Sequence, residues 1–227
     1  SHTSLRDLNV HNTGSGEQDF AVLAPSGTLT ATLTRVTARA LGPAGTSVGI
    51  YVLGDTLHDA PTALSLSDVT ASGENASASN YGLQIKDAQV TLRGGSFVGR
   101  GGARTYAISN EAGGTLSADA VTALGHQGEV RNYGLINNGT AQLSGADLTG
   151  HGGSEGAFGI QNRGSLDAYN VIATGEDGDT NFGLDNSQNS VRLNGGFLTA
   201  RGGTTSIAIR NGVQAEVLEA QGVMALA

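Results

Sequence analysis

The chain alternates apolar and polar residues over short blocks, and these blocks recur along nearly its whole length. Apolar side chains at every second position are typical of β-strands, because successive strand residues point to opposite faces. Glycine, asparagine and serine separate the blocks, as expected for turns. Eight blocks begin with an aromatic or β-branched residue at intervals of 24 to 33 residues, and these starts are Phe20, Val48, Tyr81, Tyr106, Tyr133, Phe158, Phe182 and Ile207.

The two residues after each start are also equivalent from block to block. The first is always glycine or alanine, and alternation predicts that it faces outward and leaves a bare strip of sheet that a second protomer could cover. The second is always aliphatic and is predicted to face the interior together with the aromatic residue. The aliphatic set is Val22, Ile50, Leu83, Ile108, Leu135, Ile160, Leu184 and Ile209.

The second half of each block repeats as well. Its apolar anchors are Ala31, Leu64, Leu92, Leu116, Leu143, Leu166, Leu193 and Val213. Nine residues after the anchor, seven of the eight blocks carry glycine, which predicts a recurring backbone conformation that only glycine adopts easily. These glycines are Gly73, Gly101, Gly125, Gly152, Gly175, Gly202 and Gly222.

A unit of about 25 residues with two or three short strands, repeated about eight times, predicts an all-β fold, the parallel β-helix. In this single-chain solenoid each strand pairs with its counterpart one coil away, at roughly 4.8 Å. A leucine-rich repeat would need a leucine and asparagine spacing that is absent, and a β-propeller would need about forty residues per unit.

Asparagine stands four residues after the start in the last five blocks, at Asn110, Asn137, Asn162, Asn186 and Asn211. Alternation places this position inside. Stacked one coil apart, the amides can bond to one another and to the turn backbone, which satisfies groups that would be costly to bury alone. We therefore expect an asparagine ladder.

Phrases such as VTASGENASASNYGL (69–83) and GGTLSADAVTALG (113–125) resemble the right-handed parallel β-helix passenger regions of bacterial autotransporters, the pertactin-like group, and the β-helix repeats of bacterial and phage surface fibres. The resemblance covers the chain from about residue 16. It implies a right-handed solenoid, in keeping with the usual hand of parallel crossovers, and an extracellular or bacterial cell-surface location. We expect residues 1–15 to be an expression remnant plus a partial first coil, and residues 16–227 to be a β-helix excerpted from a longer protein.

Composition excludes several classes of function. The net charge of −8 argues against nucleic acid, whose binding needs clustered lysine and arginine. The absence of cysteine excludes disulfides and thiolate zinc sites. No apolar run is long enough to span a bilayer, so we expect no membrane insertion by this segment.

Because polysaccharide lyases and glycosidases also use this fold, we searched for paired carboxylates. The two acids in one aligned column, Asp68 and Asp147, would lie three coils or roughly 14 Å apart, too far to act together. No catalytic residue is assigned, and no cofactor is expected. Asp177, Asp179 and Asn181 alternate like the start of a calcium loop, but Phe182 and Gln188 replace its glycine and glutamate, which favours a solvated acidic turn.

Eight residues after the anchors, Arg39, Arg100, His151 and Arg201 fall on alternate coils, about 10 Å apart. Guanidinium groups in such a strip would suit an anionic glycan, while solvated turn residues are the alternative. The longest loop, YVLGDTLHDAPTALS (51–65), is a second candidate for recognition.

These observations give three hypotheses. The first is a non-enzymatic extracellular stalk or adhesin segment that binds a glycan or a host surface receptor. The second is a fragment of a carbohydrate-active β-helix enzyme, either a polysaccharide lyase or a tailspike-like glycosidase. The third is an oligomeric fibre module. Two acids facing one groove would favour the enzyme.

Overall fold

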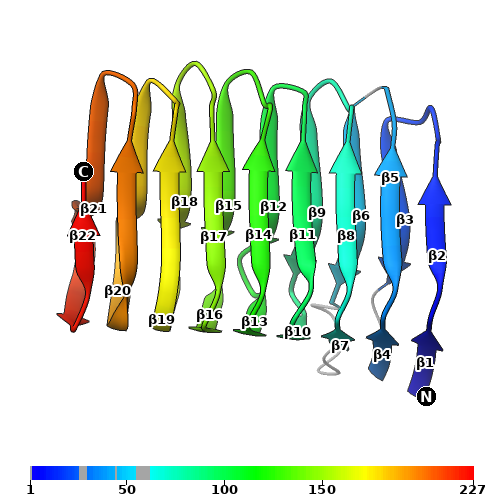
Figure 1. The fold of residues 1–227 in the computed structure, drawn as a ribbon. Helices are drawn as coiled ribbons and strands as arrows, with labels where there is room; N and C mark the ends of the chain where they lie inside the picture. Colours follow the sequence, from blue (N-terminus) through cyan, green and yellow to red (C-terminus); the bar gives the residue numbers. More distant parts are fainter. Residues whose placement is uncertain (1, 26–29, 44, 55–61) are drawn as a thin grey trace.

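A computed structural model describes residues 2–25, 30–43, 45–54 and 62–227, and every regular element in them is a β-strand. No helix in this described part is long and apolar enough to cross a membrane. The strands form three parallel sheets that run the length of a solenoid, and each coil contributes one strand segment to each sheet (Figure 1).

The first sheet contains β1 (His2–Arg6), β4 (Thr30–Thr34), β7 (Ala63–Ser67), β10 (Gln89–Arg93), β13 (Thr115–Asp119) and β16 (Thr140–Ser144). The second contains β2 (Asn9–Asn12), β5 (Thr37–Leu41), β8 (Thr70–Glu74), β11 (Ser96–Arg100), β14 (Thr122–His126), β17 (Asp147–His151) and β22 (Met224–Leu226). The third contains β3 (Gln18–Ala24), β6 (Thr46–Leu53), β9 (Ser79–Lys86), β12 (Arg104–Asn110), β15 (Arg131–Asn137) and β18 (Gly156–Asn162).

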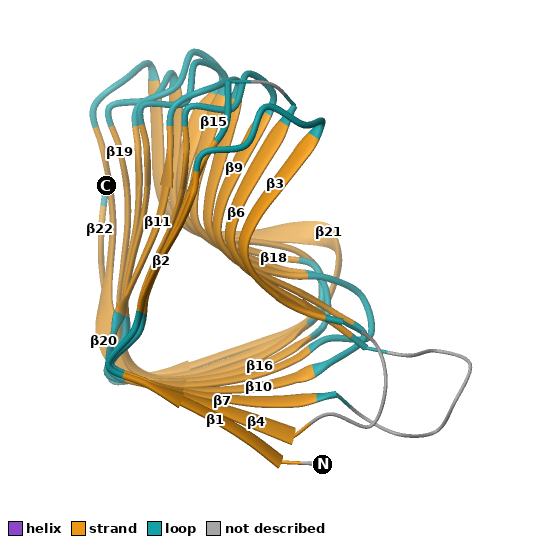
Figure 2. Cartoon of the chain, turned by 90° about the vertical axis from the view of Figure 1, so that its right-hand side faces the viewer, coloured by secondary structure: helices purple, strands orange, loops and turns teal. Residues whose placement is uncertain are grey.

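Three long strands turn the corners between sheets without a break. β19 (Ser165–Glu176) belongs to the first and second sheets, β20 (Thr180–Arg201) passes through all three, and β21 (Thr205–Gln221) belongs to the third and first. Viewed from the N-terminal end, the chain circles clockwise as it recedes (Figure 2), so the solenoid is right-handed. The predicted fold class is confirmed.

The third sheet has the register that the sequence predicts. All eight aligned starts are paired coil to coil, from Phe20 through to Ile207. The aliphatic set is paired in the same way, and its members from Ile50 to Leu184 are almost completely buried in the main core. Fully burying one such side chain contributes about 1.5–3 kcal/mol, so this column is a principal source of stability.

The first-sheet alignment is wrong in four coils. The true column is Ala31, Leu64, Val90, Leu116, Ala141, Leu166, Val191 and Leu218. The predicted anchors Leu92, Leu143 and Leu193 lie two residues further along, in the neighbouring column, and Val213 is exposed. A slip of two residues keeps the same face of a strand inside, so alternation alone does not detect it.

The asparagine ladder is confirmed. Each amide nitrogen donates to the side-chain oxygen of the next asparagine toward the C-terminus, at 2.7, 2.7, 2.9 and 2.8 Å along the series from Asn110 to Asn211. Ile85 occupies the equivalent place in the preceding coil. Because an isoleucine cannot donate, the Oδ1 atom of Asn110 is buried without a partner.

Replacing Asn162 with alanine should lower the free energy of unfolding by about 3 kcal/mol, because it leaves one amide hydrogen of Asn137 and the side-chain oxygen of Asn186 unpaired in the interior. Asn211→Ala is the matched control, since this exposed residue only accepts one bond at the end of the ladder. Urea denaturation measures both. An equal loss of unfolding free energy in the two variants would contradict a stabilising contribution from the ladder.

Candidate functional site

The strands of the third sheet bend midway, which makes the outer surface of this sheet concave (Figure 2). The bend lies at the small residue that follows each start. A Cβ atom on Gly134 would lie 2.6 Å from the backbone nitrogen of Thr149, and one on Gly150 would lie 2.4 Å from the carbonyl oxygen of Asn132. The small residues therefore face the second sheet and let the two backbones approach each other; the prediction that they face outward is wrong.

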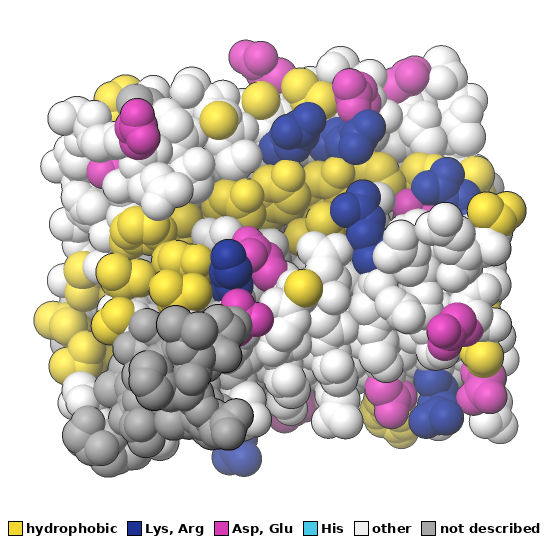
Figure 3. Space-filling model, turned by 180° about the vertical axis from the view of Figure 1, so that it is seen from behind, with side chains coloured by type: hydrophobic (Ala, Val, Ile, Leu, Met, Phe, Trp, Pro, Cys, Tyr) yellow, Lys and Arg dark blue, Asp and Glu magenta, His cyan; other side chains and the backbone are white. Residues whose placement is uncertain are grey.

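The bend also reverses the predicted orientation of the aromatic residues. Tyr133, Phe158 and Phe182, with Tyr106 and Ile207 packed against them, form a cluster separate from the main core. Residues of this column line hollows on the molecular surface, so the column lies on the outer, concave side of the sheet (Figure 2). An apolar band runs along this face of the molecule (Figure 3). Alternation fails here because the bend places two successive residues, such as Ala107 and Ile108, inside.

The aromatic rings stack face to face along the axis of the solenoid. Neighbouring centroids from Tyr81 to Phe182 lie 4.6, 5.0, 4.9 and 5.2 Å apart, and neighbouring ring planes are within 19° of each other. The three inner rings, Tyr106, Tyr133 and Phe158, are thus covered on both faces by other rings, so mainly their edges and the tyrosine hydroxyls are left for other groups. Burial raises the pKa of Tyr106 and Tyr133, so these hydroxyls stay protonated.

A groove follows this aromatic column, and we name it the third-sheet groove. It includes one hollow of about 410 Å³ and a second of about 170 Å³ toward the N-terminal end. The larger hollow is lined by Tyr81 and Tyr106. Its other lining residues are Ser109, Glu111, Ala112, Ile136, Asn138 and Arg163.

Arginines border the groove, and Lys and Arg side chains flank the apolar band on both sides (Figure 3). Arg104 and Arg131 are paired in adjacent coils, two residues before the aromatic position, while Arg163 lines the opposite side. Arg131 forms an ion pair with Glu155 at 2.7 Å. Arg104 and Arg163 have no carboxylate partner among the described residues.

Arg210 closes the C-terminal part of the groove. Its guanidinium lies 4.3 Å from the centre of the Phe182 ring and forms two hydrogen bonds, of 2.7 and 2.6 Å, with the fully buried carboxylate of Asp185. Phe158 and Phe182 are 6% and 3% exposed. Tyr81 and Tyr106 are only partly buried. The groove is therefore open over the coils of β9 and β12 and covered toward the C-terminal end.

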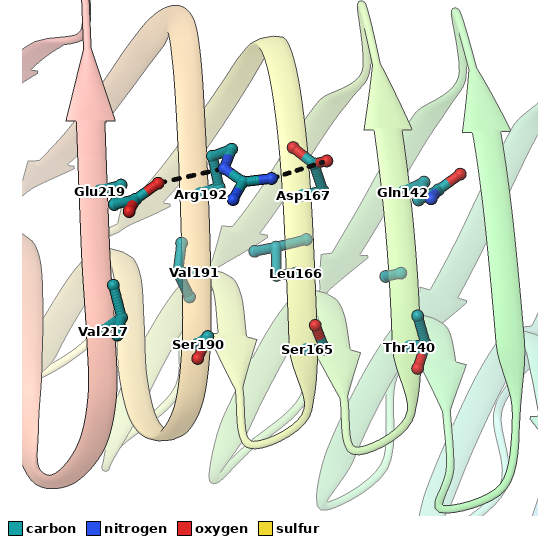
Figure 4. Close-up of a pocket in the computed structure, with 11 residues that line it drawn as sticks. Thr140, Gln142, Ser165, Leu166, Asp167, Ser190, Val191, Arg192, Val217 and Glu219 are labelled. Carbon is teal, nitrogen blue, oxygen red and sulfur yellow. Dashed lines mark hydrogen bonds and ion pairs between the residues drawn. The ribbon is translucent and has the colours of Figure 1, made fainter.

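Another hollow, of about 320 Å³, lies on the outer face of the first sheet (Figure 4). Gln142, Asp167, Arg192 and Glu219 follow one another there in register. Arg192 lies 3.1 Å from Glu219 and 3.9 Å from Asp167, so it separates the two carboxylates. The acidic side chains are 55% and 59% exposed and stand on an open sheet.

The predicted strip of Arg39, Arg100, His151 and Arg201 is only partly one column. Arg100, His151 and Arg201 do lie in register, with His126 and Glu176 between them. Arg39 lies two residues away, in register with Ser72, because of the two-residue slip in the alignment.

Most of the charges in this column are already paired. Arg201 binds Glu176, and His151 lies 3.5 Å from both Glu176 and Asp177. Arg100 donates to the side chain of Gln127 at 2.6 Å.

Arg39 is also paired, since it makes a bidentate ion pair with Glu74. Although burial would raise the pKa of Glu74, hydrogen bonds from Arg39 and Ser72 hold it below its usual value. These contacts leave fewer free cations on this strip than the sequence suggests.

The calcium candidates lie around one turn but are occupied by other contacts. Asn181 is completely buried and bonds through both of its amide atoms to the backbone of Gly178 and Gly202. Asp179 accepts a bond from Thr204, and Asp177 faces His151. No group of three acidic, histidine or cysteine side chains able to hold a metal occurs in the described part of the chain. Of the loop 51–65, residues 55–61 lie outside the described residues.

Sequence reasoning missed the third-sheet groove because it placed the aromatic residues inside. The sequence nevertheless contains a signal for Arg104 and Arg131, since each stands two residues before a tyrosine of the aromatic column. Comparison with protein-family models, curated proteins and solved structures found no match for this chain.

His126 makes the stability of the fold depend on pH. Burial lowers its pKa, with Arg100 and His151 adding to the effect and Glu74 opposing it. The unfolded chain, with a histidine pKa of about 6.5, therefore binds the proton more readily, and this residue destabilises the fold as the pH falls below that value. In His126→Gln, the loss of unfolding free energy between pH 7 and pH 5 should be smaller.

Urea denaturation at both pH values measures this effect, with His11→Gln in the second sheet as the control for removing a histidine elsewhere. The same pH dependence in wild type and His126→Gln would contradict it.

Proposed function

We propose that this chain is a non-enzymatic, extracellular β-helix segment of the autotransporter-passenger type, which acts as a structural stalk and as an adhesin at a bacterial surface. Its ligand is a glycan, and the third-sheet groove is the binding surface. The observation that carries the proposal is a row of hollows along the aromatic column, lined by Tyr81 and Tyr106 and bordered by two arginines, Arg104 and Arg163, that have no carboxylate partner in the described part of the chain.

The solenoid supports the structural part of this function. Every coil hydrogen-bonds to the next through three parallel sheets, so a rod forms whose length is proportional to the number of coils. A rod of this kind holds its side surfaces at fixed positions away from its ends, as a stalk requires.

The groove supports the adhesive part. It follows the axis of the rod across several coils, a shape that suits an extended polymer more than a compact small molecule. Hydroxyl, amide and guanidinium groups from Tyr106, Asn138 and Arg163 can bond to sugar hydroxyls. Ile136 adds an apolar surface for the sugar ring.

The carbohydrate-active enzyme is the second candidate, and Asp167 with Glu219 is the observation that favours it. The two acids occupy one outward column two coils apart, roughly 10 Å. Arg192 lies between them and forms ion pairs with both, and both acids are more than half exposed on an open sheet, whereas the general acid of a glycosidase lies in an apolar pocket. We therefore prefer the binding function.

The oligomeric fibre module has a different observation in its favour. Apolar side chains are exposed near the C-terminal end of the second sheet, including Ile172, Met224 and Leu226 at 45%, 63% and 58%. Ile172, Phe197 and Leu226 border a hollow there. Association through this surface is compatible with glycan binding, since the third-sheet groove lies on another face.

Replacing Asn138 with tryptophan should fill the larger hollow and weaken binding to immobilised glycans at least tenfold, because the ligand loses access to the groove floor. Gln142→Trp is the matched control, since it places the same ring in the first-sheet hollow. A glycan array with both variants and wild type measures this. Binding lost in Gln142→Trp but kept in Asn138→Trp, or no binding by wild type, would contradict the proposal.

A further inference from the structure

We propose that the third-sheet groove selects an anionic polysaccharide, one whose units carry carboxylate or sulfate groups, and that Arg104 and Arg163 contact these groups. This inference rests on the proposed function, because it names the class of glycan that the same groove binds.

The two arginines differ from many others in the pairing of their charges. The chain carries a net charge of −8, and four arginines outside the groove are bound to a carboxylate: Arg35, Arg39, Arg192 and Arg201. Arg104 and Arg163 are exposed and have no carboxylate partner among the described residues. A carboxylate or sulfate group in the groove could accept charge-assisted hydrogen bonds from these guanidinium groups.

The positions of the two arginines also suit a charged polymer. Arg104 lies at the start of β12, and Arg163 directly follows β18, which is two coils further along. The two residues are therefore offset by roughly 10 Å along the rod. They stand on opposite sides of the aromatic column, so a polymer in the groove passes between them and can present charges to both sides.

The ring stack also limits how a sugar can bind. Sugars that bind by aromatic stacking need a free ring face, but the rings of Tyr106, Tyr133 and Phe158 each have a neighbouring ring on both sides, at 4.6 to 5.2 Å. Polar contacts must then come from the hydroxyl, amide and guanidinium groups beside the rings. Among these groups, the guanidinium groups favour a charged glycan over a neutral one.

An acidic peptide is a weaker match for the same surface. An extended peptide gains much of its affinity by adding a strand to a free sheet edge. The strands that line the larger hollow, β9, β12, β15 and β18, pair with a strand on each side, so no such edge is available there.

The test compares wild type with the double variant Arg104→Gln/Arg163→Gln, using calorimetry or fluorescence anisotropy. The probes are a sulfated heparin hexasaccharide, a hexamer of galacturonate, neutral dextran oligomers and a polyglutamate peptide. Arg6→Gln/Arg93→Gln is the matched control, since it removes two exposed, unpaired arginines from the first sheet. The thermal melt of each variant checks that it is folded.

We expect the double variant to bind the anionic glycans about a hundredfold more weakly, about tenfold for each guanidinium, while the control stays within twofold of wild type. Binding by wild type should weaken as salt is raised. Equal binding by the double variant and wild type, or polyglutamate or dextran bound as tightly as the anionic glycans, would overturn the inference. Binding of neutral glycans alone, still blocked by Asn138→Trp, would overturn it and leave the proposed function intact; no glycan binding at all would overturn both.

Discussion

The structure depends on one constraint, the vertical registry of equivalent residues from coil to coil. Parallel strands place each residue about 4.8 Å above its counterpart, so any feature of one coil is repeated along the rod. Aliphatic side chains stack into a core, asparagines into a hydrogen-bonded ladder and aromatic rings into a column. A single misplaced coil would break all three arrays together, which explains why the repeat is kept so closely in the third sheet.

The sequence predicts this sheet well because its starts carry large, distinctive residues followed by glycine or alanine. Only one alignment of the eight repeats superposes all of these residues. The first sheet is harder, since its columns consist of alanine, valine and leucine, and a slip from Val90 to Leu92 keeps the same face inside. That slip carried over into the second sheet and placed Arg39 in the column of Arg100.

The orientation of the aromatic residues could not be obtained from alternation. It depends on how closely the second and third sheets approach, and that distance is set by facing glycines from different strands, such as Gly134 and Gly150. The approach bends the third sheet, and the bend turns Tyr106 and Tyr133 outward. The candidate site is thus a consequence of backbone packing. Its arginines can be recognised as neighbours of an exposed aromatic column only once the bend is known.

The registry has a further consequence for the size of the molecule. Because Tyr106, Tyr133 and Phe158 are interchangeable in position, a whole coil can be inserted or removed without altering the cross-section of the rod. Duplication of a gene segment that encodes about 25 residues would lengthen the third-sheet groove by one strand spacing and leave its cross-section unchanged. The length of the rod and the number of its binding positions can therefore change without any change in the side chains that contact a ligand.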